Sequence, residues 1–299
     1  MKKFNTQDNL FHRIRVLCLV ALVVLAAGCS SVRFSYNNGD TLLYWWLNAY
    51  VDIDSDQSSW VKRDIDELFQ WHRQTQLKDY VQLLENGQRQ LAGNMTQADL
   101  IAIYRDIRVR SEKLALKTVP DLAELARSLK PEQIQNLQEK FESNNEKYRK
   151  KFMRGDLEDR QRVRYKKAME QFNLWFGDFS REQEAILRKA SDARPLDNDT
   201  WLAERMRRQQ MILALMRKVH DEKLSKEATQ AAIQGLMRDI FTRMDSPERK
   251  AFYDAQVDGN TKMILTAIKI ATPKQKAHAQ KRMQGWIDDL NTLARETQK

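Results

Sequence analysis

The class of fold can be inferred from residues 57–91, which read QSSWVKRDIDELFQWHRQTQLKDYVQLLENGQRQL. Apolar side chains and one histidine recur in this stretch at steps of three and four residues, the spacing of one face of a helix. The members of this face are Val61, Ile65, Leu68, His72, Tyr80, Leu83 and Leu91. The pattern is interrupted near Gln76 and Gly87. We predict one long amphipathic helix over the whole stretch.

The composition extends the helical prediction to the rest of the chain. Among 299 residues there are 9 glycines and 5 prolines, while 42% of residues are hydrophobic and 31% are charged. Sheets and long loops need turn residues, so this scarcity favours an all-α protein, an irregular multi-helix assembly of antiparallel helices. Further helices are expected at 41–51, 96–118, 121–128, 131–153, 157–176, 181–193, 199–222, 226–243, 247–270 and 273–296. Every proline lies at a boundary between these segments, where the first turn of a helix tolerates it.

Five of these boundaries share a short motif. The copies are MTQAD (95–99), LKPEQ (129–133), FSREQ (179–183), MDSPE (244–248) and ATPKQ (271–275). The motif resembles the LTxxQ motif of small periplasmic helical chaperones, and that resemblance implies a chaperone-like role. A capping box, in which the cap residue and the residue three positions later satisfy each other's backbone amides, explains each copy alone. The spacings between copies are irregular, which argues against a solenoid repeat.

The first 28 residues have the features of a bacterial export signal. Lys2, Lys3, Arg13 and Arg15 form a positive region, and an uninterrupted apolar run of 12 residues follows at 16–27. A bilayer-spanning helix takes about 20 apolar residues, so this run is too short. The run ends in a segment that resembles a lipobox, the signal for acylation of a cysteine. This segment consists of Leu25, Ala26, Ala27 and Gly28, followed by Cys29. An ordinary cleaved signal peptide is the alternative.

The lipobox resemblance implies a lipoprotein that is anchored through acyl chains on Cys29 and has no free thiol. Ser30 after the cysteine resembles the pattern of lipoproteins sent to the outer membrane. The other cysteine, Cys18, lies in the signal, so the mature chain could form no internal disulfide. We expect a signal peptide at 1–28, a lipidated tether at 29–39 and a single helical domain at 40–299. A subdivision near 194–198 is the alternative.

A resemblance that covers essentially the mature chain carries further information. After the lipobox come RFSYNNGDTLLYWWLNAYVDIDSDQ, FQWHRQTQLKDY, LKPEQ with ESNNEKYRK, RQRVRYKKAMEQFNLWFGDFSREQ, WLAERMRRQQ and TPKQKAHAQKRMQGWIDDL. In this order the segments resemble an uncharacterised family of proteobacterial lipoproteins, described as a domain of unknown function. The resemblance implies a helical fold and an envelope location, and it implies no activity.

Residues with catalytic or metal-binding potential are few. Beyond the signal, the only histidines are His72, His220 and His278, far apart in sequence, and no HExxH, GxSxG or Walker motif occurs. The acids of 52–56 imitate the start of a calcium loop, but the glycine and the final glutamate of that loop are missing, so we expect them to cap the next helix. We predict no metal, no cofactor and no enzymatic activity. A carboxylate pair assembled from distant helices is the alternative.

A basic stretch is the first candidate binding site. Residues 146–171 hold ten lysines or arginines against five acids, and Arg160, Arg164 and Lys167 fall on one helical face. Such a face could bind an anion, such as the phosphates of lipopolysaccharide or of lipid headgroups. Nucleic acid is not expected in this compartment. A solvated face with intrahelical ion pairs is the ordinary structural explanation.

A second candidate site involves Trp60, Trp71 and His72. The two tryptophans occupy the otherwise polar face of the 57–91 helix. Large aromatic side chains are costly to leave in water, so they are either buried under a neighbouring helix or line a groove for a protein partner. His72 lies on the apolar face, where a histidine is more often a satisfied core residue than a general base.

The segment RFSYNNGDTLLYWWLNAY, 33–50, is the most aromatic in the chain. Residues 41–51 are apolar all round and too short to span a bilayer, so we predict that they insert among other helices as a core plug, with 33–39 as a hinge to the anchor. We expect a non-catalytic binding, scaffold or chaperone-like lipoprotein of the outer membrane that faces the periplasm and holds an envelope protein partner. An anion-binding module at 147–167 is the alternative, and an enzyme is a third class.

Overall fold

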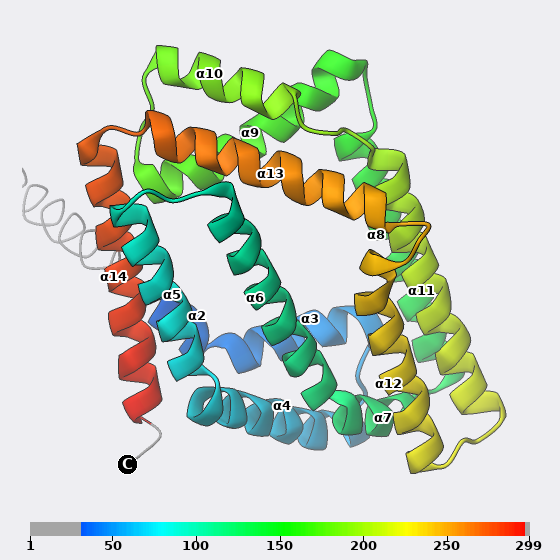
Figure 1. Cartoon of the computed structure of the whole chain (residues 1–299). Coiled ribbons are helices and arrows are strands. Elements are labelled where there is room, and N and C mark those ends of the chain that lie inside the picture. The colour runs from blue at the N-terminus through cyan, green and yellow to red at the C-terminus, as the bar shows by residue number, and fades with distance from the viewer. Residues whose placement is uncertain (1–30, 297–299) are drawn as a thin grey trace, which may run out of the picture.

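The computed structural model of the chain describes residues 31–296, and in this part the prediction of an all-α fold is confirmed (Figure 1). Thirteen α-helices and one 3₁₀ turn account for the regular structure of these residues, and no strand occurs among them. The helices are α2 Ser31–Asn37, α3 Gly39–Val51, α4 Ser55–Thr75, α5 Leu77–Ala92, α6 Gln97–Lys117, α7 Val119–Ser128, α8 Pro131–Phe152, α9 Leu157–Phe176, α10 Arg181–Asp192, α11 Asn198–Asp221, α12 Lys226–Thr242, α13 Lys250–Ile270 and α14 Pro273–Glu296.

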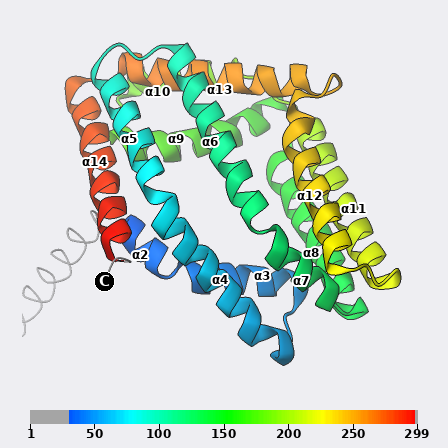
Figure 2. The ribbon, with the colours of Figure 1, turned by 60° about the horizontal axis from the view of Figure 1, so that its bottom comes forward.

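The helices are arranged as the sides of a frame. Figures 1 and 2 show α5 and α14 along one side, α9, α10 and α13 along the next, and α8, α11 and α12 along the third. Helices α3, α4 and α7 complete the frame, and α6 runs across it from the α13 side to the α7 side. None of the residues of α6 is buried, which fits a helix that touches its neighbours along edges only.

The stretch 57–91 is not one helix, so that prediction was wrong. The chain forms α4 and α5, which are separated at Gln76, and Figure 1 shows α5 turning away from α4. Leu77, directly after the break, is 1% exposed, and α5 packs along α14. The interruption of the pattern near Gln76 was therefore a true helix boundary.

The tether predicted before residue 40 is also different in the structure. Ser31–Asn37 is helix α2, and it packs against α4 and α14 rather than forming a hinge. Tyr36 Oη lies 2.9 Å from His72 Nδ1, and Arg73 Nη2 donates to Asn37 Oδ1 at 3.1 Å. At Gly39 a Cβ would lie 2.6 Å from the ring of Phe69, so glycine is required for this close approach to α4.

Helix α3 is a core plug on one face only. Leu43, Tyr44, Leu47 and Tyr50 pack against a buried cluster, and Val51 is 4% exposed. The opposite face remains open because α4 and α8 cover α3 from one side. Its large side chains lie at the surface: Leu42 is 52%, Trp45 62% and Trp46 57% exposed. The prediction of complete burial was wrong for this face.

Two buried apolar clusters stabilise the fold. One draws on α3, α4, α7, α8, α11 and α12, and the other on α5, α9, α10, α13 and α14 with adjoining loop residues. Each cluster takes residues from before and after 194–198. The clusters therefore do not separate at that position in the sequence.

Capping boxes start three of the helices at the predicted motifs, and they are formed by Thr96 with Asp99, Ser180 with Gln183, and Thr272 with Gln275. At LKPEQ only the returning half is present: Gln133 Oε1 accepts from the backbone amide of Lys130 at 2.9 Å, because a lysine side chain cannot accept a hydrogen bond. At the fourth motif, 244–248, no α-helix begins. A 3₁₀ turn at Arg243–Asp245 ends there, and α13 starts only at Lys250, where the backbone amide donates to Ser246 O. The helix start expected at 247 was wrong by three residues.

The glutamines of these motifs also join distant helix starts in pairs. Gln133 Nε2 donates to Gln57 Oε1 at 2.7 Å and to Asp52 O at 2.9 Å, which joins α8 to the start of α4. Gln183 Nε2 donates to Gln275 Oε1 at 2.9 Å, which joins α10 to α14 in the same way. The motif residues are therefore explained by capping and by the joining of helix starts.

Candidate functional site

A pocket lies where the end of α8, the first half of α9 and the start of α11 meet the loop between α10 and α11. Its volume is about 350 Å³. We call it the cationic pocket, and it is lined by Tyr148, Phe152, Arg160, Arg164, Lys167, Ala168, Arg194, Leu196, Asn198 and Trp201. Four of these ten residues are cations and none is a carboxylate. An anion that enters would therefore find positive charge without a competing negative group.

The three residues predicted from the basic stretch all line this pocket. Arg160, Arg164 and Lys167 occupy one face of α9, as the spacing indicated, and they point to the same hollow. The fourth cation, Arg194, was missed because it lies 27 residues beyond Lys167 in a connecting segment. Its position before Pro195 reads as a loop signal, and no pattern in the sequence joins it to α9.

Arg164 and Arg194 form the inner part of the pocket. Arg164 donates from Nη1 to Pro195 O at 2.7 Å and from Nη2 to Ser191 O at 2.8 Å, which caps the end of α10. Arg194 donates from Nη1 to Asn260 Oδ1 at 2.9 Å. All of these acceptors are neutral. The two guanidinium groups are thus fixed in place by bonds that leave their charge uncompensated.

The electrostatics of this pair reflect the crowding. Burial lowers the pKa of Arg194 to about 10, and the neighbouring charge of Arg164 acts in the same direction. Burial also lowers the pKa of Arg164. The nearest acid, Asp192, is engaged by Arg188, whose Nε lies 2.7 Å from Asp192 Oδ2. A bound anion would relieve the repulsion between two part-buried positive charges.

The outer cations, Arg160 and Lys167, are free to move toward a ligand. Arg160 uses only Nε, which donates to Asp156 O at 3.2 Å. Lys167 Nζ lies 5.8 Å from the centroid of the Phe152 ring. Within residues 31–296 neither side chain forms an ion pair. Both can therefore bind an anion without breaking an existing salt bridge.

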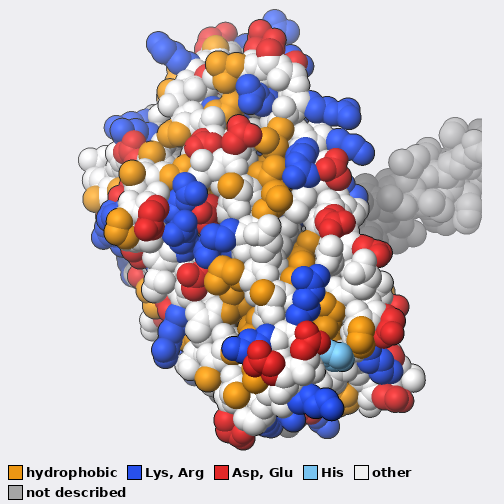
Figure 3. Space-filling model, turned by 90° about the vertical axis from the view of Figure 1, so that its right-hand side faces the viewer, with side chains coloured by type: hydrophobic (Ala, Val, Ile, Leu, Met, Phe, Trp, Pro, Cys, Tyr) orange, Lys and Arg blue, Asp and Glu red, His pale blue; other side chains and the backbone are white. Residues whose placement is uncertain are grey.

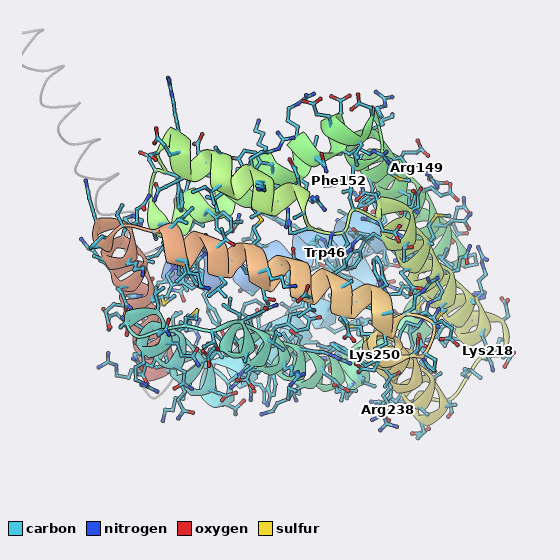
Figure 4. The ribbon with its side chains drawn as sticks, turned by 45° about the horizontal axis from the view of Figure 1, so that its top comes forward. Trp46, Arg149, Phe152, Lys218, Arg238 and Lys250 are labelled. Carbon is cyan, nitrogen blue, oxygen red and sulfur yellow. The ribbon has the colours of Figure 1, made fainter. Side chains whose placement is uncertain are left out.

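Aromatic rings form the remaining wall. The rings of Tyr148 and Phe152 are 5.0 Å apart, and Trp201 packs edge-on against Phe252 at 5.2 Å and Tyr253 at 5.7 Å. Figure 4 labels Phe152 and Arg149, both in the last turn of α8. A ligand with an apolar or ring portion beside its anionic group would contact this wall.

Figure 3 shows the side of the molecule with α11 and α12. Lys and Arg side chains lie there among Asp and Glu and scattered hydrophobic groups, so positive and negative charges are mixed on this side.

A second, apolar hollow of about 150 Å³ involves Trp60. We call it the apolar hollow, and it is lined by Leu43, Trp46, Leu47, Trp60, Val61, Asp64, Ile65, Leu68, Thr118, Asp121, Leu122 and Leu125. Two carboxylates, Asp64 and Asp121, are part of this lining, and burial together with the charge of Asp64 raises the pKa of Asp121. A concave apolar surface with an acidic edge suits a partner segment that carries apolar and basic side chains.

The other two residues of the predicted groove lie elsewhere. Trp71 and His72 are about three turns beyond Trp60 on α4, and neither lines the apolar hollow. Lys117 Nζ lies 5.5 Å from the centroid of a Trp71 ring. His72 contacts the rings of Tyr36 and Tyr80, and burial lowers its pKa. The groove predicted from three residues thus keeps only Trp60.

Asp54, His220 and His278 have structural partners. Asp54 accepts hydrogen bonds from the amides of Asp56 and Gln57 and caps α4, which confirms the capping role expected for 52–56. His278 Nδ1 lies 2.9 Å from Trp175 O, and His220 pairs with Asp221. Across residues 31–296, no group of three or more His, Cys, Asp or Glu side chains could hold a metal ion.

The family of the chain follows from comparison with known proteins. Residues 49–241 match the model of a family of unknown function, DUF6279. The chain belongs to this family. No curated protein and no solved structure matches the chain. The DUF6279 region runs from the end of α3 to the end of α12, and it includes all residues that line the cationic pocket.

The residues predicted for membrane attachment lie outside the described part of the chain. They are Cys29 and the lipobox residues Leu25, Ala26, Ala27 and Gly28. Among the helices of residues 31–296, none has the length and apolar character needed to cross a membrane.

Proposed function

We propose that the protein is a lipid-anchored, periplasm-facing lipoprotein of the outer membrane that binds a phosphate-type anion in the cationic pocket and has no catalytic role. The observation that carries the proposal is the lining of this pocket, with four cations and no carboxylate. The lining also contains no histidine or cysteine. Such a set of residues is suited to hold an anion rather than to activate a nucleophile.

The anchoring part of the proposal rests on the sequence. A positive region, a 12-residue apolar run and small residues precede Cys29 in the order that a lipoprotein signal requires. Helix α2 begins two residues after this cysteine. An acylated Cys29 would therefore keep the helical body close to the membrane surface.

The ligand class follows from the types of cation. Arginines at 160, 164 and 194 offer planar sets of N–H donors that match phosphate oxygens, and Lys167 adds a mobile point charge. Lipopolysaccharide, lipid headgroups and free phosphate compounds share this chemistry. The aromatic wall favours a phosphate that is attached to an apolar or ring-shaped group.

The test compares two charge-matched double variants. Arg160→Gln/Lys167→Gln removes the two outer cations of the pocket, whereas Lys147→Gln/Lys166→Gln removes two exposed cations of the same basic stretch that do not line it. Calorimetry would measure binding of pyrophosphate, phosphatidylglycerol vesicles and lipopolysaccharide micelles. The pocket variant should lose about tenfold or more in affinity, since each charge-assisted hydrogen bond is worth roughly 1.5 kcal/mol or more.

The outcomes separate the possible sources of the anion. Binding of pyrophosphate alone would indicate a free phosphate compound, and binding of vesicles or micelles alone would indicate a lipid. The affinity should fall with added salt in every positive case. Equal losses in the two double variants, or binding to none of the three probes, would contradict the proposal.

A second candidate function is a scaffold or chaperone-like role for an envelope protein partner. The observation that favours it is the apolar hollow beside Trp60. Substitution Trp60→Ala should weaken capture of a partner from envelope extracts, whereas Trp286→Ala, at the ring pair with Trp175, should not. A partner captured equally well by both variants would count against the hollow.

A further inference from the structure

The strongest unassigned feature is the open apolar face of α2 and α3. Ten large hydrophobic side chains are exposed in the described chain, and four of them fall within residues 34–46. They are Phe34 (71% exposed), Leu42, Trp45 and Trp46. Leu42, Trp45 and Trp46 are spaced three and four residues apart, so they lie on one side of α3. We call these four residues the aromatic face.

We propose that the aromatic face rests in the interfacial layer of the bilayer that carries the lipid anchor. This inference rests on the proposed anchoring at Cys29. It adds that the folded body does not hang freely from its acyl chains but binds the membrane surface through named side chains. The occupant of the face is a phospholipid surface rather than a protein.

The aromatic face begins close to the proposed anchor in the sequence. Only Ser30 separates Cys29 from helix α2, and an extended residue spans at most about 3.5 Å. The 21 residues from Ser31 to Val51 cover roughly 30 Å if they run as helix. Phe34 is five residues from the acylated cysteine, and Trp46 lies about 22 Å along the helices from Ser31. The whole face therefore reaches the membrane when α2 and α3 lie along its surface.

The side chains of the aromatic face have the chemistry of a membrane interface. Tryptophan is enriched at membrane–water interfaces, where its ring is buried among headgroups while its indole N–H stays hydrated. Two adjacent tryptophans that are each more than half exposed would leave a large apolar area in water. Contact with the interface removes this area from water at no cost in folding.

The charges beside the face indicate which headgroups it meets. Lys62 Nζ lies 4.6 Å from the centroid of the Tyr44 ring, and Trp45 shares a surface hollow with Lys62 and with the acids Asp40 and Asp66. Burial and the charge of Asp40 raise the pKa of Asp66. Mixed charges of this kind do not attract an anionic surface. The contact should therefore be driven by apolar burial, and it should be insensitive to salt, unlike binding at the cationic pocket.

The experiment uses the acylated full-length protein in vesicles of phosphatidylethanolamine and phosphatidylglycerol that carry bromine in the upper part of the acyl chains. Bromine quenches indoles that enter the interface. Trp45 and Trp46 are two of seven tryptophans, so about a quarter of the emission should be quenched. The Trp45→Ser/Trp46→Ser variant should lose this quenching. The control Trp286→Ser, at the ring pair with Trp175 and outside both the aromatic face and the cationic pocket, should keep it.

Further measurements keep the inference separate from the anchoring proposal. Mass spectrometry reports acylation of Cys29, and circular dichroism checks that each variant folds. If the wild type is acylated but its quenching matches that of Trp45→Ser/Trp46→Ser, the aromatic face is not at the membrane. The inference is then wrong, and the anchoring proposal is supported. If the wild type is not acylated but is still quenched through these tryptophans, the aromatic face binds the bilayer by itself. In that case only the anchoring proposal is wrong.

A protein occupant is the remaining alternative. If the aromatic face pairs with a second copy, sedimentation should detect a dimer that Trp45→Ser/Trp46→Ser dissociates, and vesicle quenching should be absent. That result would overturn the inference. Salt up to 0.5 M should leave the quenching unchanged, whereas a contact governed by charge would weaken markedly because salt screens exposed charges.

Discussion

The carboxylate of Glu204 gives the sharpest test of how the frame is stabilised. Its side chain is 1% exposed and lies on α11, one turn from Trp201 of the cationic pocket. It accepts from Arg249 Nε at 2.5 Å, from Arg207 Nε at 3.3 Å and from Arg243 Nη2 at 3.4 Å. The bonds from Arg243 and Arg249 join α11 to the 3₁₀ turn Arg243–Asp245 and to the start of α13. We consider the substitution Glu204→Gln, which keeps the shape and removes the charge.

The magnitude follows from what each arginine can do without Glu204. Arg207 also pairs with Asp239 at 2.8 Å, and Arg243 pairs with Glu248 at 3.1 Å. Arg249 has no other acidic partner among the ion pairs of residues 31–296. Glu204→Gln therefore removes the short charge-assisted bond from Arg249 completely and weakens the longer bonds from Arg207 and Arg243. The expected loss in unfolding free energy is about 3 kcal/mol. For a chain of 299 residues the midpoint of thermal unfolding should fall by roughly 5 °C.

The pH dependence has a definite sign. Burial alone would raise the pKa of Glu204, but the hydrogen bonds from Arg249 and Arg243 outweigh it and hold the pKa below its usual value of 4.5. The ionised carboxylate of Glu204 thus contributes its full share of the unfolding free energy above pH 4.5. This contribution is lost as the pH falls through the pKa of Glu204 in the folded state, which is lower than 4.5. The difference between wild type and Glu204→Gln should shrink over that acidic range.

Urea unfolding followed by circular dichroism would measure the effect. The control is Glu222→Gln, because Glu222 lies 4.0 Å from Lys218 with both side chains more than half exposed. That exposed pair should contribute at most about 0.5 kcal/mol. A loss below 1 kcal/mol in Glu204→Gln, or one no larger than in the control, would refute the assignment of Glu204 as a buried anchor of three arginines.

Three further predictions concern other parts of the chain. Gln133→Ala should lower the free energy of unfolding in urea by about 2–3 kcal/mol, because the side chain loses its hydrogen bonds with Lys130 N, Asp52 O and Gln57 Oε1. The exposed control Gln135→Ala should change it little. Burial lowers the pKa of His72, so the unfolding free energy of the wild type should fall as the pH drops below 6.5. His72→Gln should reduce this dependence of stability on pH, and an unchanged dependence would contradict the prediction. Cys29→Ser should move the protein from the membrane fraction to the soluble periplasm, and retention in the membrane would contradict the anchor.

Local rules in the sequence predicted the helices well and their directions poorly. The segment 157–176 is a helix with the predicted bounds, and capping boxes mark three helix starts where they were expected. The break at Gln76 was visible only as a weak interruption of the pattern, because no proline or glycine enforces it. Its cause is tertiary, since α5 packs along α14, which begins nearly 200 residues later. Propensity within a window cannot report such a contact.

The candidate sites show the same limit. The spacing of Arg160, Arg164 and Lys167 was enough to place them together, because all three lie within two turns of one helix. Arg194 comes from another segment, and only the meeting of that loop with α9 brings it into the pocket. Trp60 and Trp71 lie on the same face of one helix but are about 16 Å apart along it. For this reason only Trp60 lines the apolar hollow.

The position of the cationic pocket relative to α3 bears on the source of its ligand. The ring of Tyr50 in α3 packs 6.0 Å from that of Phe141 in α8, and Phe152 in the pocket lies eleven residues further along α8. At 1.5 Å per residue, the pocket is about 16 Å along this helix from the α3 contact. If the aromatic face rests on the bilayer and α8 rises from it, the pocket opens beyond the headgroup layer. A ligand presented from the periplasm, rather than a headgroup of the same leaflet, would then reach it, and the pyrophosphate and vesicle arms of the binding experiment distinguish these two cases.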